Sequence, residues 1–440
     1  MMAGSRRAGR GPIRGIRIAV GAALLLGTLA GQATAQLRGH GGPVRALAVS
    51  PDGLRAVSGS FDQSSILWSV DDGVALGVLR FHDGAVSAVA FLPDGDFLSG
   101  GEDGRIALWR AGEAAPIRQF AEHSGPVAAI AVSPDGRDLA SASWDGTARI
   151  RSLAGGGQRV LEGHGGNVNA VAFLPDGRPV TAGSDLTLRI WPKEAGGAPV
   201  IVTLPSTLNA VATAPDGEIA TAGADGIVRL LKADGTLRAA IELPRGPVIA
   251  LASSPDGSRI AAATVVGTVA VIDRAEARIL FHLVGPGLPV WSLAYRPDGR
   301  EILTGGSDRL VRRWNAMSGE PIGPVSLERP KDMLAGFTGS RGAEVFQACA
   351  ACHTLTPDDG NRAGPTLHGV FGRRIATAPG YPFTEALKKL DIVWSSDTIS
   401  KLFEIGPARY TPGTKMPEQI VSNERDRAAL VEFLRGATRP

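Results

Sequence analysis

VRALAVSPDG at residues 44–53 is the first of seven related stretches in this 440-residue chain. Its first six residues alternate as in a β-strand, and Pro-Asp-Gly then favours a tight turn. Proline presets one φ angle, aspartate can bond its own downstream backbone, and glycine takes the positive φ. The tripeptide recurs every 40 to 42 residues, beginning at Pro51, Pro93, Pro134, Pro175, Pro215, Pro255 and Pro297. This period predicts seven equivalent units of supersecondary structure.

Polar and aromatic residues recur at fixed places within these units. An aspartate precedes a tryptophan by six residues at Asp62/Trp68, Asp103/Trp109, Asp185/Trp191 and Asp308/Trp314. The tryptophan is missing after Asp145 and Asp225. A serine or threonine stands four residues before each aspartate, at Ser58, Ser99, Ser141, Thr181, Thr221 and Thr304. Four units also carry a histidine, at His40, His82, His123 and His164.

This pattern resembles the WD-repeat family of β-propellers, in which such side chains form a hydrogen-bonded chain inside each blade. The resemblance implies an all-β, seven-bladed propeller over residues 36–328. The sixth repeat departs most, with Ala262 and Val266 at shared positions. We therefore expect its blade to be less firmly held by such hydrogen bonds.

The closure of the ring has two possible solutions. The outer strand of the last blade could come from residues 321–327, or from residues 36–38 just before His40. Either would remove an open sheet edge.

The first 35 residues have the composition of a cleaved signal peptide. Five arginines without an acid precede an apolar run at residues 18–30, and Ala33-Thr34-Ala35 is a small-x-small cleavage site. The run is short for a hydrocarbon core that needs about 20 apolar residues, so we expect no permanent membrane anchor. Export to the periplasm, with cleavage near Ala35, is expected.

The charge balance excludes one class of partner. The formal net charge is +3, but five of the 46 basic residues lie in the first 35. The remaining chain carries 41 basic and 43 acidic residues. It lacks a basic surplus for phosphate binding, and we expect no nucleic-acid role.

The alternation ends at residues 329–339, which carry proline and glycine and are interpreted as a linker. Helical periodicity follows at residues 341–347 and 424–435, within a small all-α domain over residues 340–440. Asn423 stands at the N-cap position of the last helix.

The chain's two cysteines stand in the segment Cys349-Ala350-Ala351-Cys352-His353. C-x-x-C-H is the attachment signature of c-type haem, because two such thiols can form thioethers and the next imidazole can bind iron. A thioredoxin-type dithiol would need a strand before the motif. A zinc site would need further ligands, and His368 alone is a poor complement.

Residues 340–440 resemble a class I cytochrome c of the mitochondrial and bacterial soluble type. GPTLHGVFGR at residues 364–373 and YTPGTKM at residues 410–416 match two segments of that family. The resemblance implies one covalent haem c with its iron. It implies attachment and axial ligation through Cys349, Cys352, His353 and Met416.

The resemblance also implies a supporting set of cofactor-binding residues. The carbonyl of Pro365 would hold the other ring nitrogen of His353. The remaining members are Arg373, Thr384 and Trp394 on the propionate side, and Tyr410 and Thr414 in the methionine loop.

The sequence departs from the cytochrome c pattern at four positions. Phe383 and Phe403 stand where tyrosine is usual, Leu387 replaces a polar residue, and Glu418 stands where an aromatic often covers the haem edge. Hydrogen bonds near the haem are thereby lost. His/Met ligation still implies a relatively high reduction potential.

These features together predict an electron carrier and not an enzyme, since an iron with both axial positions filled leaves none for a substrate. Lys388, Lys389 and Lys415 are candidates to surround the haem edge and steer an acidic redox partner. The propeller would be a rigid docking platform for proteins. The formal net charge is −4 for residues 36–330 and +2 for residues 331–440, and these opposite signs agree with a docking role for the propeller.

Two alternatives remain open. In a reductase-like subunit the propeller would hold a haem of its own and would need axial ligands. Its five histidines offer none, because four take the structural position of the repeat and His282 lies in an outer-strand run. A redox-linked scaffold or sensor cannot be separated from the carrier by sequence.

Overall fold

The computed structural model describes residues 1, 4, 36–40, 42–113, 115–121, 123–244, 246–323, 334–347, 349–351, 353–357, 364–381, 383–414, 416 and 420–439. The expected signal peptide, apart from residues 1 and 4, and the first five residues of the linker lie outside these residues, as do Cys352, Lys415 and Glu418. Within the described part, no helix is long and apolar enough to cross a membrane.

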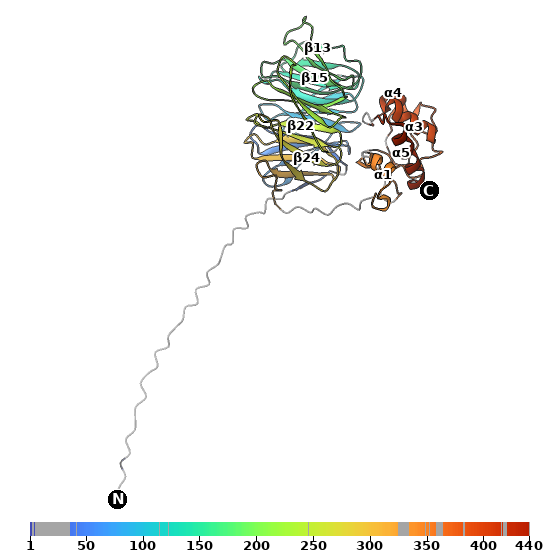
Figure 1. The fold of residues 1–440 in the computed structure, drawn as a ribbon. Helices are drawn as coiled ribbons and strands as arrows, with labels where there is room; N and C mark the ends of the chain where they lie inside the picture. Colours follow the sequence, from blue (N-terminus) through green and yellow to red (C-terminus); the bar gives the residue numbers. More distant parts are fainter. Residues whose placement is uncertain are drawn as a thin grey trace. The chain divides into compact units, whose positions relative to one another are not determined.

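Seven four-stranded antiparallel sheets form a propeller, as the repeat predicts (Figure 1). Blade 1 consists of β2 (Val44–Val49), β3 (Arg55–Ser60), β4 (Ser64–Ser69) and β5 (Val74–Arg80), and blade 2 of β6 (Val86–Phe91), β7 (Phe97–Gly101), β8 (Arg105–Trp109) and β9 (Arg118–Ala121). Blade 3 consists of β10 (Val127–Val132), β11 (Asp138–Ser143), β12 (Ala148–Ser152) and β13 (Gln158–Leu161), and blade 4 of β14 (Val168–Phe173), β15 (Pro179–Gly183), β16 (Thr187–Ile190) and β17 (Val200–Thr203). Blade 5 consists of β18 (Leu208–Thr213), β19 (Ile219–Gly223), β20 (Ile227–Leu231) and β21 (Leu237–Glu242), and blade 6 of β22 (Val248–Ser253), β23 (Arg259–Thr264), β24 (Thr268–Asp273) and β25 (Arg278–Val284). Blade 7 consists of β26 (Val290–Tyr295), β27 (Glu301–Gly306) and β28 (Leu310–Asn315) together with β1 (Gln36–Arg38). The first strands of successive blades contact one another, and β26 contacts β2, so the ring is closed.

The outer strand of blade 7 combines both segments that sequence analysis left open. β1 pairs antiparallel with β28, with Leu37 opposite Val311. Further along β28, Trp314 bridges Pro321, and the amide of Ile322 donates to the carbonyl of Arg313 over 3.0 Å. The outer strand of the last blade is therefore mainly β1, and residues 321–322 extend it along β28.

The repeated polar residues form the expected chain inside blade 1. His40 lies 3.0 Å from Asp62 through Nδ1 and 2.7 Å from the Ser58 hydroxyl through Nε2. Trp68 donates its indole N–H to the same hydroxyl over 2.8 Å. Blades 2 and 4 repeat the whole chain, and blade 3 repeats it without the tryptophan.

Arginine replaces histidine as the partner of the aspartate in two blades. Arg229 lies 2.6 Å from Asp225 in blade 5, and Arg312 lies 2.7 Å from Asp308 in blade 7. In blade 4, where histidine is present, the equivalent Arg189 stays 3.6 Å from its aspartate. The aspartate carboxylate is thus bound in six blades, by histidine in blades 1 to 4 and by arginine in blades 5 and 7.

Blade 6 is organised differently, as its sequence suggests. Its core is built of small side chains, and Ala261, Ala262 and Ala270 are fully buried. The Thr264 hydroxyl donates to the carbonyl of Thr268 and accepts its amide. That this blade is less firmly held by hydrogen bonds than the others stays a prediction.

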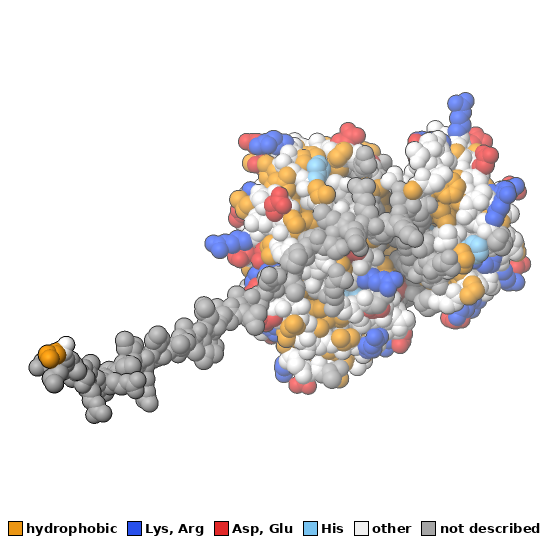
Figure 2. Space-filling view, turned by 90° about the horizontal axis from the view of Figure 1, so that it is seen from below, with side chains coloured by type: hydrophobic (Ala, Val, Ile, Leu, Met, Phe, Trp, Pro, Cys, Tyr) orange, Lys and Arg blue, Asp and Glu red, His pale blue; other side chains and the backbone are white. Residues whose placement is uncertain are grey.

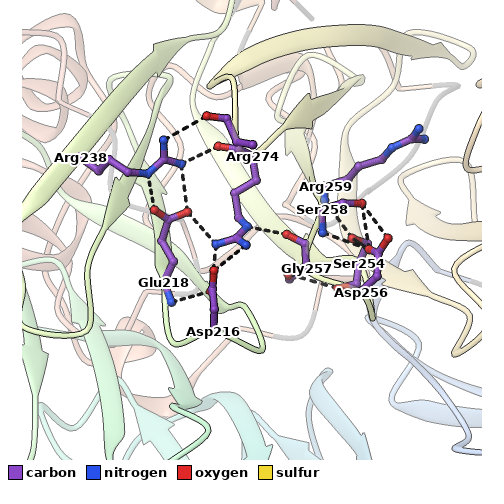
Figure 3. A network of polar contacts seen from close by, with 11 residues as sticks. Asp216, Glu218, Arg238, Ser254, Asp256, Gly257, Ser258, Arg259 and Arg274 are labelled. Carbon is purple, nitrogen blue, oxygen red and sulfur yellow. Dashed lines mark hydrogen bonds and ion pairs between the residues drawn. The ribbon is translucent and has the colours of Figure 1, made fainter.

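Arginines also join neighbouring blades on one side of the ring. Each donates to carbonyls that follow the third strand of the next blade: Arg118 to Leu153, Arg159 to Pro192 and Lys193, Arg178 to Ala233, Arg238 to Arg274 and Ala275, Arg259 to Ala316, and Arg313 to Val70. Figure 3 shows the junction of blades 5 and 6, where Glu218 accepts from both Arg238 and Arg274. Arg274 also binds Asp216 and the carbonyl of Gly257.

The junction of blades 7 and 1 is a charge cluster whose members are largely buried in blade 7, while Asp71 of blade 1 is exposed. Arg313 donates to Glu301 over 3.0 Å and to the carbonyl of Val70, 243 residues away, over 2.8 Å. Arg296 binds Glu301 and reaches Asp71 of blade 1 over 2.9 Å. The Arg313 side chain is 3% exposed, so water can replace little of this binding.

A small helical domain follows. It consists of η1 (Ala335–Phe337), α1 (Arg341–Phe346), η2 (Cys349–Ala351), α2 (Glu385–Lys388), α3 (Ser396–Ile405), α4 (Pro407–Tyr410) and α5 (Glu424–Ala437). The two predicted helices are confirmed as α1 and α5. Asn423 caps α5 by accepting the amides of Arg425 and Asp426.

The first and last helices of this domain cross closely. A Cβ on Gly342 would lie 2.1 Å from the carbonyl oxygen of Ala429, so only glycine allows this approach. Phe346 is fully buried, and its ring centroid lies 5.3 Å from that of Phe433. This crossing forms one wall of the domain's core.

We predict that Arg313→Met lowers the free energy of unfolding by about 3 kcal/mol, because breaking a buried ion cluster leaves charge uncompensated. Arg110→Met is the matched control, since Arg110 is exposed and 3.4 Å from Asp96, and should cost no more than about 0.5 kcal/mol. Denaturant unfolding is followed by tryptophan fluorescence, which reports mainly on the propeller. Equal stability of the two variants would contradict a closing role for Arg313.

The propeller should lose stability on acidification in two steps. Burial lowers the pKa of His164 despite Asp185, so stability falls as the pH drops below the ordinary value of 6.5. Burial raises the pKa of Asp62 and Asp103, but hydrogen bonds led by those from His40 and His82 outweigh it and hold both pKa values well below 3.8. Their contribution is lost as the pH falls below about 3.8. An unfolding midpoint that is constant between about pH 7 and 3 would contradict this account.

Candidate haem site

His353 is held at a defined tautomer directly after η2. Its amide donates to the carbonyl of Cys349 over 3.0 Å, which places the residue on the turn after the first cysteine. Its Nδ1 lies 2.7 Å from the carbonyl oxygen of Pro365 and can only donate to it. Burial lowers the pKa of His353, although the Pro365 carbonyl opposes this shift. The ring is therefore neutral, and the lone pair of Nε2 is available to a metal.

Gly364 makes room for this imidazole. A Cβ at this position would lie 2.4 Å from Cε1 of His353 and 2.8 Å from Nδ1. Any larger residue must push the ring away or open the loop. Gly364 is a functional residue that the sequence analysis quoted in a segment but did not single out.

Arg373 braces the loop that presents the Pro365 carbonyl. Its guanidinium donates to the carbonyls of Thr366 over 2.7 Å and of His368 over 2.9 Å. Burial lowers the pKa of Arg373. Its guanidinium thus supports the loop next to the ligand, while its expected propionate contact stays a prediction.

Met416 follows α4 in a loop of consecutive turns. The amide of Thr411 donates to Pro407, and the amide of Thr414 donates to Thr411. The Thr414 hydroxyl then accepts the amide of Met416 over 3.1 Å. The half-buried Met416 side chain packs against the domain core.

His353 and Met416 line the same cavity. Its walls are largely apolar and include Leu367, Val370, Leu387, Trp394, Ile399, Leu402, Phe403 and the buried Cys349. The expected residues Pro365, Arg373, Thr384, Trp394 and Thr414 also line it. Among described residues, Tyr410 lies outside the lining and packs on the core from α4, and Cys352 is not described.

The donor set fits haem c. An imidazole and a thioether are suitable axial donors for such a haem, and Cys349 at the apolar cavity offers a thiol for its covalent attachment. The two alternatives fare worse. α1 stands before the motif, where a thioredoxin-type dithiol would need a strand. A zinc site would need a further ligand, and His368 lies outside the cavity lining among the described residues.

The comparisons with known proteins agree with both halves of this structure. A family model described as "Cytochrome c" matches residues 339–438. Cytochrome c of Gibberella zeae is 39% identical over 107 residues, which are 24% of this chain and 100% of the relative. That of Arabidopsis thaliana is 42% identical over 100 residues, 22% of this chain and 88% of the relative. The chain belongs to the cytochrome c family.

The propeller has a separate relationship. The model described as "WD domain, G-beta repeat" matches residues 31–69, 73–110, 114–152, 156–192 and 278–315. These ranges omit residues 193–277, which cover most of blades 5 and 6. In those blades arginine or small residues stand in for the histidine network, and the fold persists without its usual sequence signature.

The cytochrome c domain carries a covalently bound haem c with iron, and cytochromes c are electron carriers. When bound, this group supplies reversible one-electron oxidation and reduction. WD-repeat propellers suggest protein interaction. The chain therefore combines an electron-carrier domain with an interaction domain.

Gly364→Ala should disturb the site through one methyl group, because that group overlaps the His353 ring. We expect the absorption spectrum of the purified protein to change and less haem to be attached during maturation. Gly436→Ala is the matched control, since a Cβ there meets nothing within 4 Å. A native spectrum for Gly364→Ala would show that the loop yields at no cost.

Proposed function

We propose that this chain is an exported electron carrier with His353 and Met416 as axial ligands and with a propeller that docks proteins. The observation that carries the proposal is the pairing of an oriented neutral imidazole with a packed methionine in one cavity. With both axial positions supplied by the chain, a small substrate has no position to bind. His/Met ligation also favours a relatively high potential.

The proposed haem-edge contact uses exposed lysines near α2. Lys388 already pairs with Glu385 over 2.7 Å, which reduces its net field at a distance. Lys389 is exposed one residue further on. We therefore assign the larger share of steering to Lys389, acting with Lys415 on an acidic redox partner.

The proposed platform is a face of the propeller. Figure 2 shows acidic and basic side chains interspersed on one face, so recognition there would depend on local groups more than on overall charge.

Export rests on the N-terminal residues alone. A reporter fused to residues 1–40 should reach the periplasm, and the same fusion with Arg6 and Arg7 retained but residues 18–30 deleted should not. Retention of the first fusion in the cytoplasm would contradict the proposed location.

Met416→Ala should abolish the methionine–iron charge-transfer band of the ferric protein, because no other thioether lines the cavity among described residues. The exposed Met317 provides the control, and Met317→Ala should keep the band. A band that survives in Met416→Ala would refute this ligation. Rapid nitrite or peroxide consumption by the unmodified protein would favour a reductase instead.

A further inference from the structure

Blade 7 lacks the histidine that blades 1 to 4 place between an aspartate and a hydroxyl. His40 stands four residues before β2, and the equivalent position before β26 holds Pro286. In blade 1 the imidazole contacts the Ser58 hydroxyl over 2.7 Å. A proline side chain offers neither a donor nor an acceptor, so the polar groups of blade 7 that would face a histidine need another partner.

Two buried donors of blade 7 are not used within its network. Arg312 is 6% exposed and donates through Nε to Asp308 over 2.7 Å, but its buried Nη1 has no hydrogen-bond partner among the described residues. The Thr304 hydroxyl accepts the indole N–H of Trp314 over 2.9 Å, and no described residue accepts the proton of this hydroxyl. Buried donors are normally hydrogen-bonded, either to protein or to ordered water.

Both donors line a small cavity between blades 6 and 7. The cavity has a volume of about 20 Å³, and Asp308 also lines it. Blade 6 contributes an apolar wall that includes Val269 and Leu283. One water molecule needs about 10–15 Å³ of such space and two to four polar partners, so the cavity has the size and the polar groups that a single water requires.

We propose that this cavity binds one water molecule, which takes the place of the missing imidazole. The water accepts hydrogen bonds from Nη1 of Arg312 and from the Thr304 hydroxyl, and it donates to the Asp308 carboxylate. That carboxylate disfavours a halide ion and the guanidinium disfavours a metal cation, so the cavity selects a neutral ligand that both donates and accepts. The site lies wholly within the propeller and does not depend on the proposed electron transfer.

Blade 5 shows why the hydroxyl matters. Arg229 also replaces histidine there, lies 2.6 Å from Asp225 and has a buried Nη1 without a partner in the described part of the chain. The hydroxyl of that blade, on Thr221, instead donates to the carbonyl of Ala210 over 2.9 Å. A water in blade 5 would lack this second donor, and we therefore assign the site to blade 7.

Pro286→His tests the proposal in solution, because it restores the ring that four other blades carry. Water-oxygen magnetic relaxation dispersion counts the long-lived waters of the reduced full-length protein, and we expect this variant to bind one fewer than the unmodified protein. Pro244→His is the matched control. It replaces the proline at the equivalent position of blade 6, where Ala262 and Val266 stand instead of the hydroxyl and the aspartate, and should keep the unmodified count. Equal counts in all three proteins would overturn the proposal.

A high-resolution crystal structure of the unmodified full-length protein decides the question without any variant. We expect electron density for one water within hydrogen-bonding distance of both Arg312 Nη1 and the Thr304 hydroxyl. No density there while other buried waters are visible, or a protein group bonded to Nη1, would overturn the proposal. Anomalous scattering at this position after a bromide soak would also overturn it, because the cavity would then bind an anion.

Discussion

The hydrogen bond from His353 to the carbonyl of Pro365 is the interaction on which the functional half of the molecule depends. At 2.7 Å it fixes the ring orientation and leaves the other nitrogen as a lone-pair donor. Two further features exist to make it possible: Gly364 leaves space for the ring, and Arg373 braces the carbonyl-bearing loop. Replacing any one of these would alter the orientation of the proposed ligand His353.

In the propeller, a side chain of the same blade likewise binds the aspartate carboxylate of the repeat. Histidine performs this in blades 1 to 4, and arginine does so in blades 5 and 7. The choice has a thermodynamic consequence in blade 4, because burial lowers the pKa of His164 and this blade loses stability in mild acid, whereas a guanidinium stays charged. Arginine contacts from Arg178 and Arg313 join blades of the two kinds.

Much of this was predictable from residues close in sequence. The Pro-Asp-Gly period predicts the blade number, and the spacing of histidine, hydroxyl and aspartate predicts the blade networks. Gly364 shows the limit of such reasoning, because its role comes from a ring eleven residues away. The closing strand was ambiguous because two short segments compete for one sheet edge, and both are used. The arginine junctions were missed since their acceptors are backbone carbonyls, which leave no trace in sequence.

The central claim is that the chain supplies both axial ligands and therefore moves electrons without binding a small substrate. Carbon monoxide binding to the reduced, purified full-length protein tests this most directly. The account predicts a spectrum that carbon monoxide leaves unchanged at neutral pH, together with reversible one-electron oxidation. Rapid formation of a carbon monoxide complex by the unmodified protein would show an open position and contradict the account.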